Sequence, residues 1–254
     1  MNGPANPAPH AAVQLWAEHA PEAGYPPKVL PVPRPIKGTS FFPGGFGLWN
    51  PEASEFLPDF PYGGTMILGH DFHSETGYQD SLRRGHESLT QPTWRNLLVL
   101  LDSAGIAPTT CFFTNVFMGL REGNATTGKF PGATDLAFVA HCRRFLVRQI
   151  GLQRPSLIVT LGIHAPKILA PLSPGLAPWA TGSGIKHLDG VGPLRSRIEV
   201  TGITDYRTTA VALIHPSLRH ASVRHRRYGD LIGNEAELKM LRDARGRASQ
   251  MVRE

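Results

Sequence analysis

Four short apolar runs, separated by segments with helical periodicity, constrain the fold of this chain most. They are TMILG (65–69), TCFFTNV (110–116), SLIVTLG (156–162) and TAVALIH (209–215). None of them alternates polar and apolar residues, which is typical of strands that are covered on both faces. Strands that alternate with helices favour a parallel sheet with right-handed crossovers. The sequence therefore predicts an α/β fold, a three-layer α/β/α sandwich around a central four-stranded parallel sheet.

The segments between and after these runs place apolar residues at helical spacing. They are PTWRNLLVLLDSAGI (92–106), TDLAFVAHCRRFLVRQIG (134–151), HAPKILAPL (164–172) and YGDLIGNEAELKMLRDA (228–244). In the first, one stripe contains Trp94, Leu97, Leu98 and Leu101. Pro92 stands near its start, where a missing N–H is tolerated, whereas Pro171 breaks the third segment early. We expect a helix from each segment, with helices on both faces of the sheet.

The first 37 residues differ from the rest because they contain nine prolines. Proline fixes φ and donates no backbone hydrogen bond, so this segment is expected to form neither a regular helix nor a central strand. We therefore divide the chain into a proline-rich N-terminal arm (1–37) and one α/β domain (38–254). The arm is expected to wrap the domain as an extended segment or to stay disordered, and Trp16 indicates that part of it docks.

The composition limits the partner and the chemistry. The formal net charge is +6 and the isoelectric point is near 9.6, which suits a polyanionic partner. Two cysteines, Cys111 and Cys142, are too few for a disulfide framework or for the four thiolates of an iron–sulfur cluster. No apolar stretch approaches the ~20 residues of a membrane helix, and the N-terminus shows no secretory signal. We therefore expect a cytoplasmic protein without a membrane partner.

Polar residues and a glycine stand where the four predicted strands end. Asp71 follows the first strand, Asn115 ends the second, Gly162 and His164 follow the third, and His215 ends the fourth. In open α/β sheets, ligands bind outside the carboxyl ends of the strands. The sequence therefore predicts one site at this edge, formed by residues that lie far apart in the chain.

The segment after the fourth strand is the second unusual feature. His215 precedes Pro216, and the residue before a proline is driven out of the helical region. The chain therefore turns there and presents His215 and Ser217 at the sheet edge. Four arginines follow in RHASVRHRR (219–227). Such a run forms either a solvated basic face or a patch that grips phosphates.

Four motifs, in chain order, resemble those of the uracil-DNA glycosylase superfamily. They are GHDFH, FFTNV, LIVTLGIHAPKIL and LIHPSLR, and the resemblance runs from about Met66 to Tyr228. It implies a repair enzyme that flips uracil out of DNA, hydrolyses the N-glycosidic bond and leaves an abasic site. The implied partner is uracil-containing DNA, bound by a monomer that needs no cofactor.

The resemblance also implies roles for individual residues. Asp71 would stabilise the cationic sugar and position or activate water, and His215 would hydrogen-bond the uracil oxygen that gains negative charge. Asn115 would read the pyrimidine edge of uracil, which cytosine presents with the opposite donor and acceptor order. The remaining predicted substrate contacts are Gly69, His70, Phe72 and His73. The predicted DNA contacts are Pro216, Ser217, Leu218 (a candidate wedge), Arg219, Arg224 and Arg226.

The chain departs from the family pattern in three ways. The first motif of the family reads DPYH where this chain has Asp71-Phe72-His73, so either His73 replaces the tyrosine that excludes thymine or one residue is missing. The aromatic residue that stacks on uracil has Phe72 and Tyr78 as candidates. The cysteines that hold a cluster in one branch of the family are absent, which makes this chain an atypical, cluster-free member.

Three other functions are open at this stage. His70, Asp71, His73 and His215 are plausible metal ligands of a metal-dependent hydrolase, although their spacing matches no known metal motif. A non-catalytic protein that binds DNA lesions or abasic sites could use the same fold, although pure binding does not need Asp71 near phosphates. A serine hydrolase built on Ser217 is weaker, because the chain has no G-x-S-x-G elbow.

Overall fold

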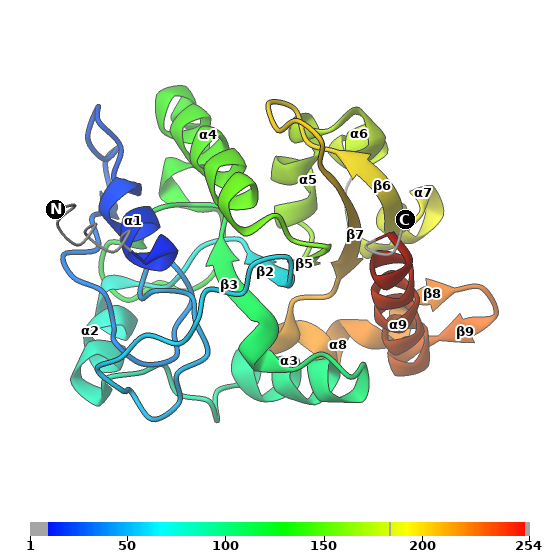
Figure 1. Cartoon of the computed structure of the whole chain (residues 1–254), viewed down its shortest axis with the longest axis horizontal. Helices are drawn as coiled ribbons and strands as arrows, with labels where there is room; N and C mark the ends of the chain where they lie inside the picture. Colours follow the sequence, from blue (N-terminus) through cyan, green and yellow to red (C-terminus); the bar gives the residue numbers. More distant parts are fainter. Residues whose placement is uncertain (1–9, 183, 252–254) are drawn as a thin grey trace, which may run out of the picture.

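A five-stranded sheet forms the centre of the computed structural model, which describes residues 10–182 and 184–251 (Figure 1). Its strand order is β3-β2-β5-β7-β6. The parallel strands are β2 (Thr65–Gly69), β3 (Cys111–Asn115), β5 (Leu157–Leu161) and β7 (Arg207–Leu213). Strand β6 (Leu194–Glu199) runs antiparallel to β7 at one edge. The predicted α/β sandwich and its four parallel strands are confirmed.

The fifth strand, β6, corrects the prediction of a four-stranded sheet. Its sequence, LRSRIE, contains three charged residues and one serine, and only Ile198 is buried. A register irregularity between Arg195 and Ile198 interrupts its pairing with β7. An edge strand with one solvated side does not form the continuous apolar run that identifies central strands. Sequence periodicity therefore misses it.

Helices cover both faces of the sheet, and the strand residues alternate between two cores. One core contains Met66 and Leu68 of β2 with residues of α4 (Leu136–Gln153), α5 (Ala165–Leu169), α6 (Ala177–Ala180) and α7 (Ile185–Val191). The other contains Ile67 of β2 with residues of α3 (Pro92–Ser103) and α9 (Gly233–Met251). In Figure 1, α4 and α5 lie above the sheet, and α3 and α9 lie below it. The three layers follow from this period of two.

The helices predicted from periodicity are confirmed as α3, α4, α5 and α9, with shifted ends. Pro92 is the first residue of α3, and the Asp135 side chain caps α4 by accepting from the Phe138 N–H at 2.8 Å. Helix α2 (Glu75–Arg84) was not predicted, because it is largely polar. Its ends nevertheless carry helix signals: Ser74 is the N-cap, and Gly85 is left-handed at the C-terminus.

The remaining elements are short. Strand β1 (Val29–Leu30) pairs with β4 (Leu120–Arg121), and β8 (Arg227–Tyr228) pairs with β9 (Leu231–Ile232). A four-residue helix, α8 (Arg219–Ser222), follows β7. The 3₁₀ turns are η1 (Pro108–Thr110), η2 (Pro131–Thr134), η3 (Ala170–Leu172), η4 (Pro174–Leu176), η5 (Pro216–Leu218) and η6 (Val223–His225). None of the described helices is both long and apolar enough to cross a membrane.

The described part of the proline-rich arm contains a helix, α1 (Ala11–Glu18), which corrects the prediction of a segment without helix. This stretch contains no proline, so each of its residues has the backbone N–H that a helix needs. The His10 side chain caps the helix, and Leu15 is fully buried. Trp16 donates a hydrogen bond to the Pro43 carbonyl at 3.2 Å and packs against the core. The docking of Trp16 is therefore confirmed. Residues 1–9 of the arm lie outside the described residues.

Candidate active site

The carboxyl ends of the parallel strands bring the predicted residues to one edge of the sheet. Gly69 of β2 pairs in register with Asn115 of β3. Gly162 follows β5 with φ +82°, and a Cβ there would lie 3.3 Å from the Cβ of His215, which follows β7. His164 follows Gly162, and its ring centroid lies 4.9 Å from that of His70. Residues that follow β2, β3, β5 and β7 therefore meet as the topology requires.

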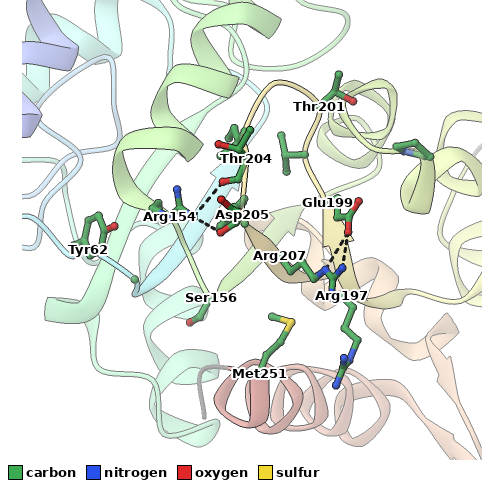
Figure 2. Close-up of a pocket in the computed structure, with 15 residues that line it drawn as sticks. Tyr62, Arg154, Ser156, Arg197, Glu199, Thr201, Thr204, Asp205, Arg207 and Met251 are labelled. Carbon is green, nitrogen blue, oxygen red and sulfur yellow. Dashed lines mark hydrogen bonds and ion pairs between the residues drawn. The ribbon is translucent and has the colours of Figure 1, made fainter. Parts of the chain in front are cut away.

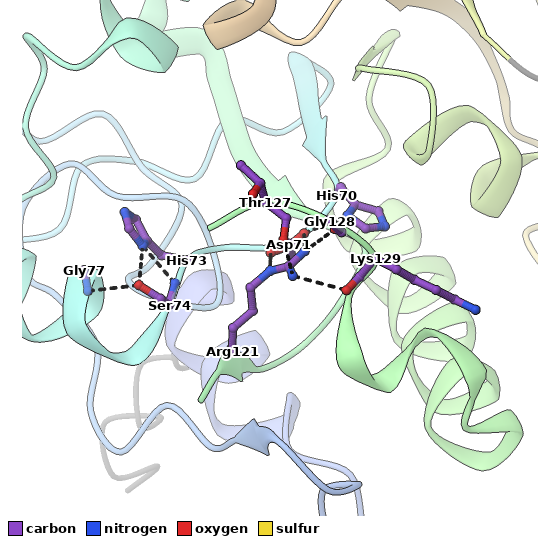
Figure 3. Close-up of polar contacts among 9 residues, drawn as sticks. All are labelled: His70, Asp71, His73, Ser74, Gly77, Arg121, Thr127, Gly128 and Lys129. Carbon is purple, nitrogen blue, oxygen red and sulfur yellow. Dashed lines mark hydrogen bonds and ion pairs between the residues drawn. The ribbon is translucent and has the colours of Figure 1, made fainter. Parts of the chain in front are cut away.

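Asp71 is bound on both carboxylate oxygens by an arginine that sequence analysis did not identify. Arg121 of β4 donates from Nε to Oδ2 at 2.7 Å and from one terminal nitrogen to Oδ1 at 3.1 Å (Figure 3). His70 Nδ1 lies 2.6 Å from Oδ1. The side chains of Asp71 and Arg121 are 11% and 5% exposed, so this is a mostly buried, bidentate ion pair.

The contacts of Asp71 keep it ionised. Burial on its own would raise the pKa of Asp71. The hydrogen bonds from His70 and Arg121, together with their charges, outweigh burial and hold the pKa below its ordinary value. Asp71 is therefore a carboxylate at neutral pH, and a fixed negative charge stands at the sheet edge.

The contacts of His215 determine which of its two ring nitrogens carries the proton. The Ser217 backbone N–H donates to His215 Nδ1 at 3.3 Å, and Ser217 Oγ lies 2.8 Å from the same nitrogen. Since an N–H only donates, Nδ1 is an acceptor, and the proton of the neutral ring sits on Nε2. Burial lowers the pKa of His215; the Asp71 carboxylate opposes this shift and His70 adds to it. His215 is therefore a neutral imidazole with an Nε2–H donor, within electrostatic range of Asp71.

The segment after β7 is braced from two sides. Glu237 of α9 is fully buried and accepts from the Ile214 N–H at 2.5 Å and from Arg219. Asn96 of α3 donates to the Pro216 carbonyl at 2.8 Å. Arg219 thus anchors the segment to α9, and its predicted role as a phosphate contact stays a prediction. The side chain of Arg219 is only 14% exposed.

Arg226 is placed differently from the prediction. Its side chain is fully buried, donates to the Ala212 carbonyl at 2.8 Å and forms an ion pair with Asp189 at 3.3 Å. Burial lowers the pKa of Arg226 to about 10, although Asp189 opposes the shift. The prediction that Arg226 grips the DNA backbone is wrong, because the folded chain covers the guanidinium. Arg224 is exposed, and its Nε lies 3.1 Å from His225 Nε2.

Ser217 and Leu218 stay at the surface, beside the buried Pro216. Ser217 is exposed, and Leu218 is 58% exposed. Their predicted roles in DNA binding require such exposure, and those roles stay predictions.

Asn115 and Gly69 form a tight pair below the edge. Asn115 is 3% exposed and donates from Nδ2 to the Phe42 carbonyl at 3.0 Å. A Cβ at Gly69 would lie 2.2 Å from Asn115 Oδ1, so only glycine leaves room for this amide. The role of Asn115 in reading uracil stays a prediction. One of its two amide protons already has a protein partner.

Phe72 and His73 pack toward α2 and the segment before β2. The Phe72 ring fills the space over Gly44, where a Cβ would lie 2.1 Å from it. His73 Nδ1 accepts from the Ser74 N–H at 2.8 Å, and its ring lies against Gly77. Figure 3 shows His73 pointing toward the start of α2 and away from Asp71. Tyr78, the other stacking candidate, is fully buried and donates to the Arg34 carbonyl at 2.8 Å.

Two cavities, of about 980 and 990 Å³, lie elsewhere in the described part of the chain. The first lies near the amino ends of β5 and β7, where Arg154, Glu199 and Arg207 line it (Figure 2). Arg207 pairs with Glu199 at 2.9 Å, and Arg154 donates to backbone carbonyls. The second is lined by residues of α1, the segment after it and the start of α4. Neither is lined by Asp71 or His215, so volume alone does not locate the site.

Metal ligands were also predicted at this edge as an alternative. Within residues 10–182 and 184–251, no three His, Cys, Asp or Glu side chains are grouped so that they could hold a metal ion. Cys111 and Cys142 are buried free thiols, and burial raises the pKa of each to about 12.

Comparison with protein families gives a match that extends over more than half of the chain. The family model described as the uracil DNA glycosylase superfamily matches residues 77–237. The match includes Asn115, His164 and His215 but begins after Asp71, whose assignment rests on the resemblance of its own motif. No curated protein matches the chain significantly. The chain belongs to the uracil DNA glycosylase superfamily, a family of DNA-binding glycosylases of base excision repair.

Proposed function

We propose that this chain releases uracil from DNA by hydrolysing its N-glycosidic bond. The observation that supports this most is the pairing, at one sheet edge, of an ionised Asp71 with a neutral His215. The two residues follow different strands, and only the parallel topology brings them within electrostatic range. Their charge states match the two charges that develop when a glycosidic bond breaks.

The proposed reaction needs no group beyond water and the substrate. The bond between C1′ and N1 of uracil breaks, and its electron pair moves onto the base while the sugar becomes cationic. Asp71 stabilises that cation as a fixed anion, and the His215 Nε2–H donates to the uracil oxygen that becomes negative. Water then adds to C1′, and its proton leaves to solvent or to the departing base. The products are free uracil and an abasic site.

The exposed residues near His215 complete the proposal. The target base has to leave the stack, because C1′ is inaccessible within the duplex. Leu218 is the proposed wedge that fills the vacated space, and Ser217 the proposed phosphate contact; both are exposed as these roles require. Asn115 is proposed to select uracil over cytosine through its amide.

Alkaline cleavage of uracil-containing DNA tests the proposal. The full-length protein is incubated with oligonucleotides that carry one uracil, in single- and double-stranded form, with a cytosine oligonucleotide as the control. We expect alkali to cut only the uracil strand, equally with and without EDTA. Tight binding without strand cleavage would instead support a lesion-binding protein. Activity that EDTA abolishes and zinc restores would support a metal-dependent hydrolase.

A further inference from the structure

Every N–H group of the Arg121 guanidinium donates a hydrogen bond, either to Asp71 or to a nearby loop. Besides its two bonds to Asp71, it donates to the carbonyls of Thr127 at 3.1 Å, Gly128 at 2.9 Å and Lys129 at 3.2 Å. A guanidinium has five N–H donors, and these five bonds account for all of them. Figure 3 shows the guanidinium between Asp71 and the segment 127–129.

The segment that Arg121 holds is the exposed end of a loop whose first residues, Glu122 and Gly123, have hydrogen bonds of their own to Lys28, Glu75 and Thr76. Residues 122–129 are all exposed, and Gly123 and Gly128 have positive φ values of 74° and 84°. The chain becomes buried again at Phe130, whose ring lies 5.5 Å from the Arg121 guanidinium carbon. Arg121 therefore joins an exposed loop, here named the 122–129 loop, to the carboxylate at the sheet edge.

We propose that Arg121 is a positioning residue for the glycosylase reaction: it fixes Asp71 as an oriented anion and holds the 122–129 loop beside it. This inference rests on the proposed function. Arginine suits the task because its planar fork binds both carboxylate oxygens and still reaches three carbonyls. Lysine would keep the charge but not this geometry.

The hydrogen bonds also leave the two oxygens of Asp71 with different capacities to accept further bonds. Oδ1 accepts from His70 and from Arg121, whereas Oδ2 accepts from Arg121 Nε alone. A carboxylate oxygen has two lone-pair positions, so Oδ2 keeps one for a water molecule or for the sugar cation. With its pKa held low, Asp71 is a weak base, and it acts on the sugar by its charge more than by taking a proton.

The pH dependence of excision separates this role from a structural one. Single-turnover rates are measured between about pH 5 and pH 8 for the parent, Arg121→Gln and Arg121→Lys. We expect Arg121→Gln to lower the rate on the order of 10²-fold. The ratio of the parent's rate to the variant's rate should increase as the pH falls. Burial raises the pKa of Asp71, and in the variant the guanidinium no longer opposes that shift. Arg121→Lys keeps a charge, so its ratio to the parent should change little with pH.

Four histidines lie near enough to Asp71 to interact with it. His70 contacts its carboxylate, and the charge of Asp71 acts on the pKa of His73, His164 and His215. Arg121→Lys is therefore the reference for the pH dependence, because it keeps a positive charge beside Asp71 and leaves all four histidines in place. Arg207→Gln is the matched control, since Arg207 forms an exposed ion pair with Glu199 at the amino end of β7. A constant ratio for Arg121→Gln at every pH would overturn the positioning role and leave Arg121 as a structural residue.

A second measurement does not depend on activity. If the parent releases no uracil, the proposed function fails, but thermal unfolding still tests the ion pair. Arg121→Gln leaves a buried carboxylate without its partner, so its unfolding temperature should fall at neutral pH. Adding Asp71→Asn should restore part of that loss. Amide exchange in the 122–129 loop should accelerate in Arg121→Gln and not in Arg207→Gln. No restoration, together with unchanged exchange, would overturn the inference.

Discussion

At the scale of single residues, Asp71 and His215 have the charge states that the proposed reaction requires. Asp71 stays ionised because His70 and Arg121 compensate for its burial. His215 stays neutral because burial disfavours its charged form, and its Nδ1 is occupied by Ser217. Both arrangements exist before DNA binds, so the protein does not need to reorganise when the bond breaks.

Removing either residue is expected to slow chemistry more than binding. Asp71→Asn and His215→Ala should each reduce the single-turnover excision rate by ~10²–10³-fold. DNA affinity should largely survive, because phosphate contacts supply most of it and neither residue makes one in this proposal. Rates and binding are measured on the same uracil oligonucleotide. His141→Ala on α4 is the matched histidine control. Parental rates for both site variants would show that the site is wrongly assigned.

At the scale of elements, the segment between β7 and α8 depends on two helices that lie far from it in sequence. Asn96 of α3 holds the Pro216 carbonyl, and Glu237 of α9 holds the Ile214 N–H. Together they fix His215, which lies between the two contacts. A short segment without a sheet partner would otherwise move, and a catalytic group that moves loses its alignment.

Removing the contact between Asn96 and Pro216 is expected to reduce stability slightly and the excision rate more strongly. Asn96→Ala removes one hydrogen bond, which should lower the free energy of unfolding by about 0.5–1.5 kcal/mol. The excision rate should fall roughly 10–100-fold, since misplacement by an ångström costs that much. Denaturant unfolding and single-turnover kinetics measure the two effects. Val99→Ala, an exposed residue on the same helix, is the control. A loss of stability without any loss of rate would show that Asn96 does not position His215.

At the scale of the whole molecule, the net charge is +6, and the arginines that contribute to it include both buried and exposed residues. Arg121 and Arg226 are buried, and Arg219 is mostly buried. Their charges are used within the protein, in ion pairs that hold the fold. Arg224 and Arg227, in the same basic run, are exposed and are the better candidates for phosphate contacts.

The salt dependence of DNA binding tests that division. Each lost phosphate contact should reduce the slope of log affinity against log salt by ~0.9 on duplex DNA. Arg224→Ala combined with Arg227→Ala should therefore weaken binding to uracil-containing and ordinary DNA alike, with a shallower slope. The preference for uracil over cytosine should not change. Arg207→Gln, which removes one exposed charge elsewhere, is the control. An unchanged slope in the double variant would show that the exposed arginines of 219–227 form a solvated surface and do not contact phosphates.

The sequence by itself determined the central strands, the main helices and the edge that carries the site. Met66, Ile67 and Leu68 are apolar in succession because both faces of β2 are covered, and this signal is local. The position of Asp71 and His215 at one edge follows from parallel topology alone. These features depend on short-range patterns, which a single sequence displays directly.

Only the tertiary structure decided which charged residues are buried and what they bind. Arg121 lies 50 residues from Asp71, in a two-residue strand that no periodicity reveals. Arg219 and Arg226 belong to a basic run that reads as surface, yet α9 and β7 cover both side chains. The same holds for β6, whose charged pattern hides an edge strand. A buried charge is tolerated only with a specific partner, and that partner comes from distant chain segments that folding alone brings together.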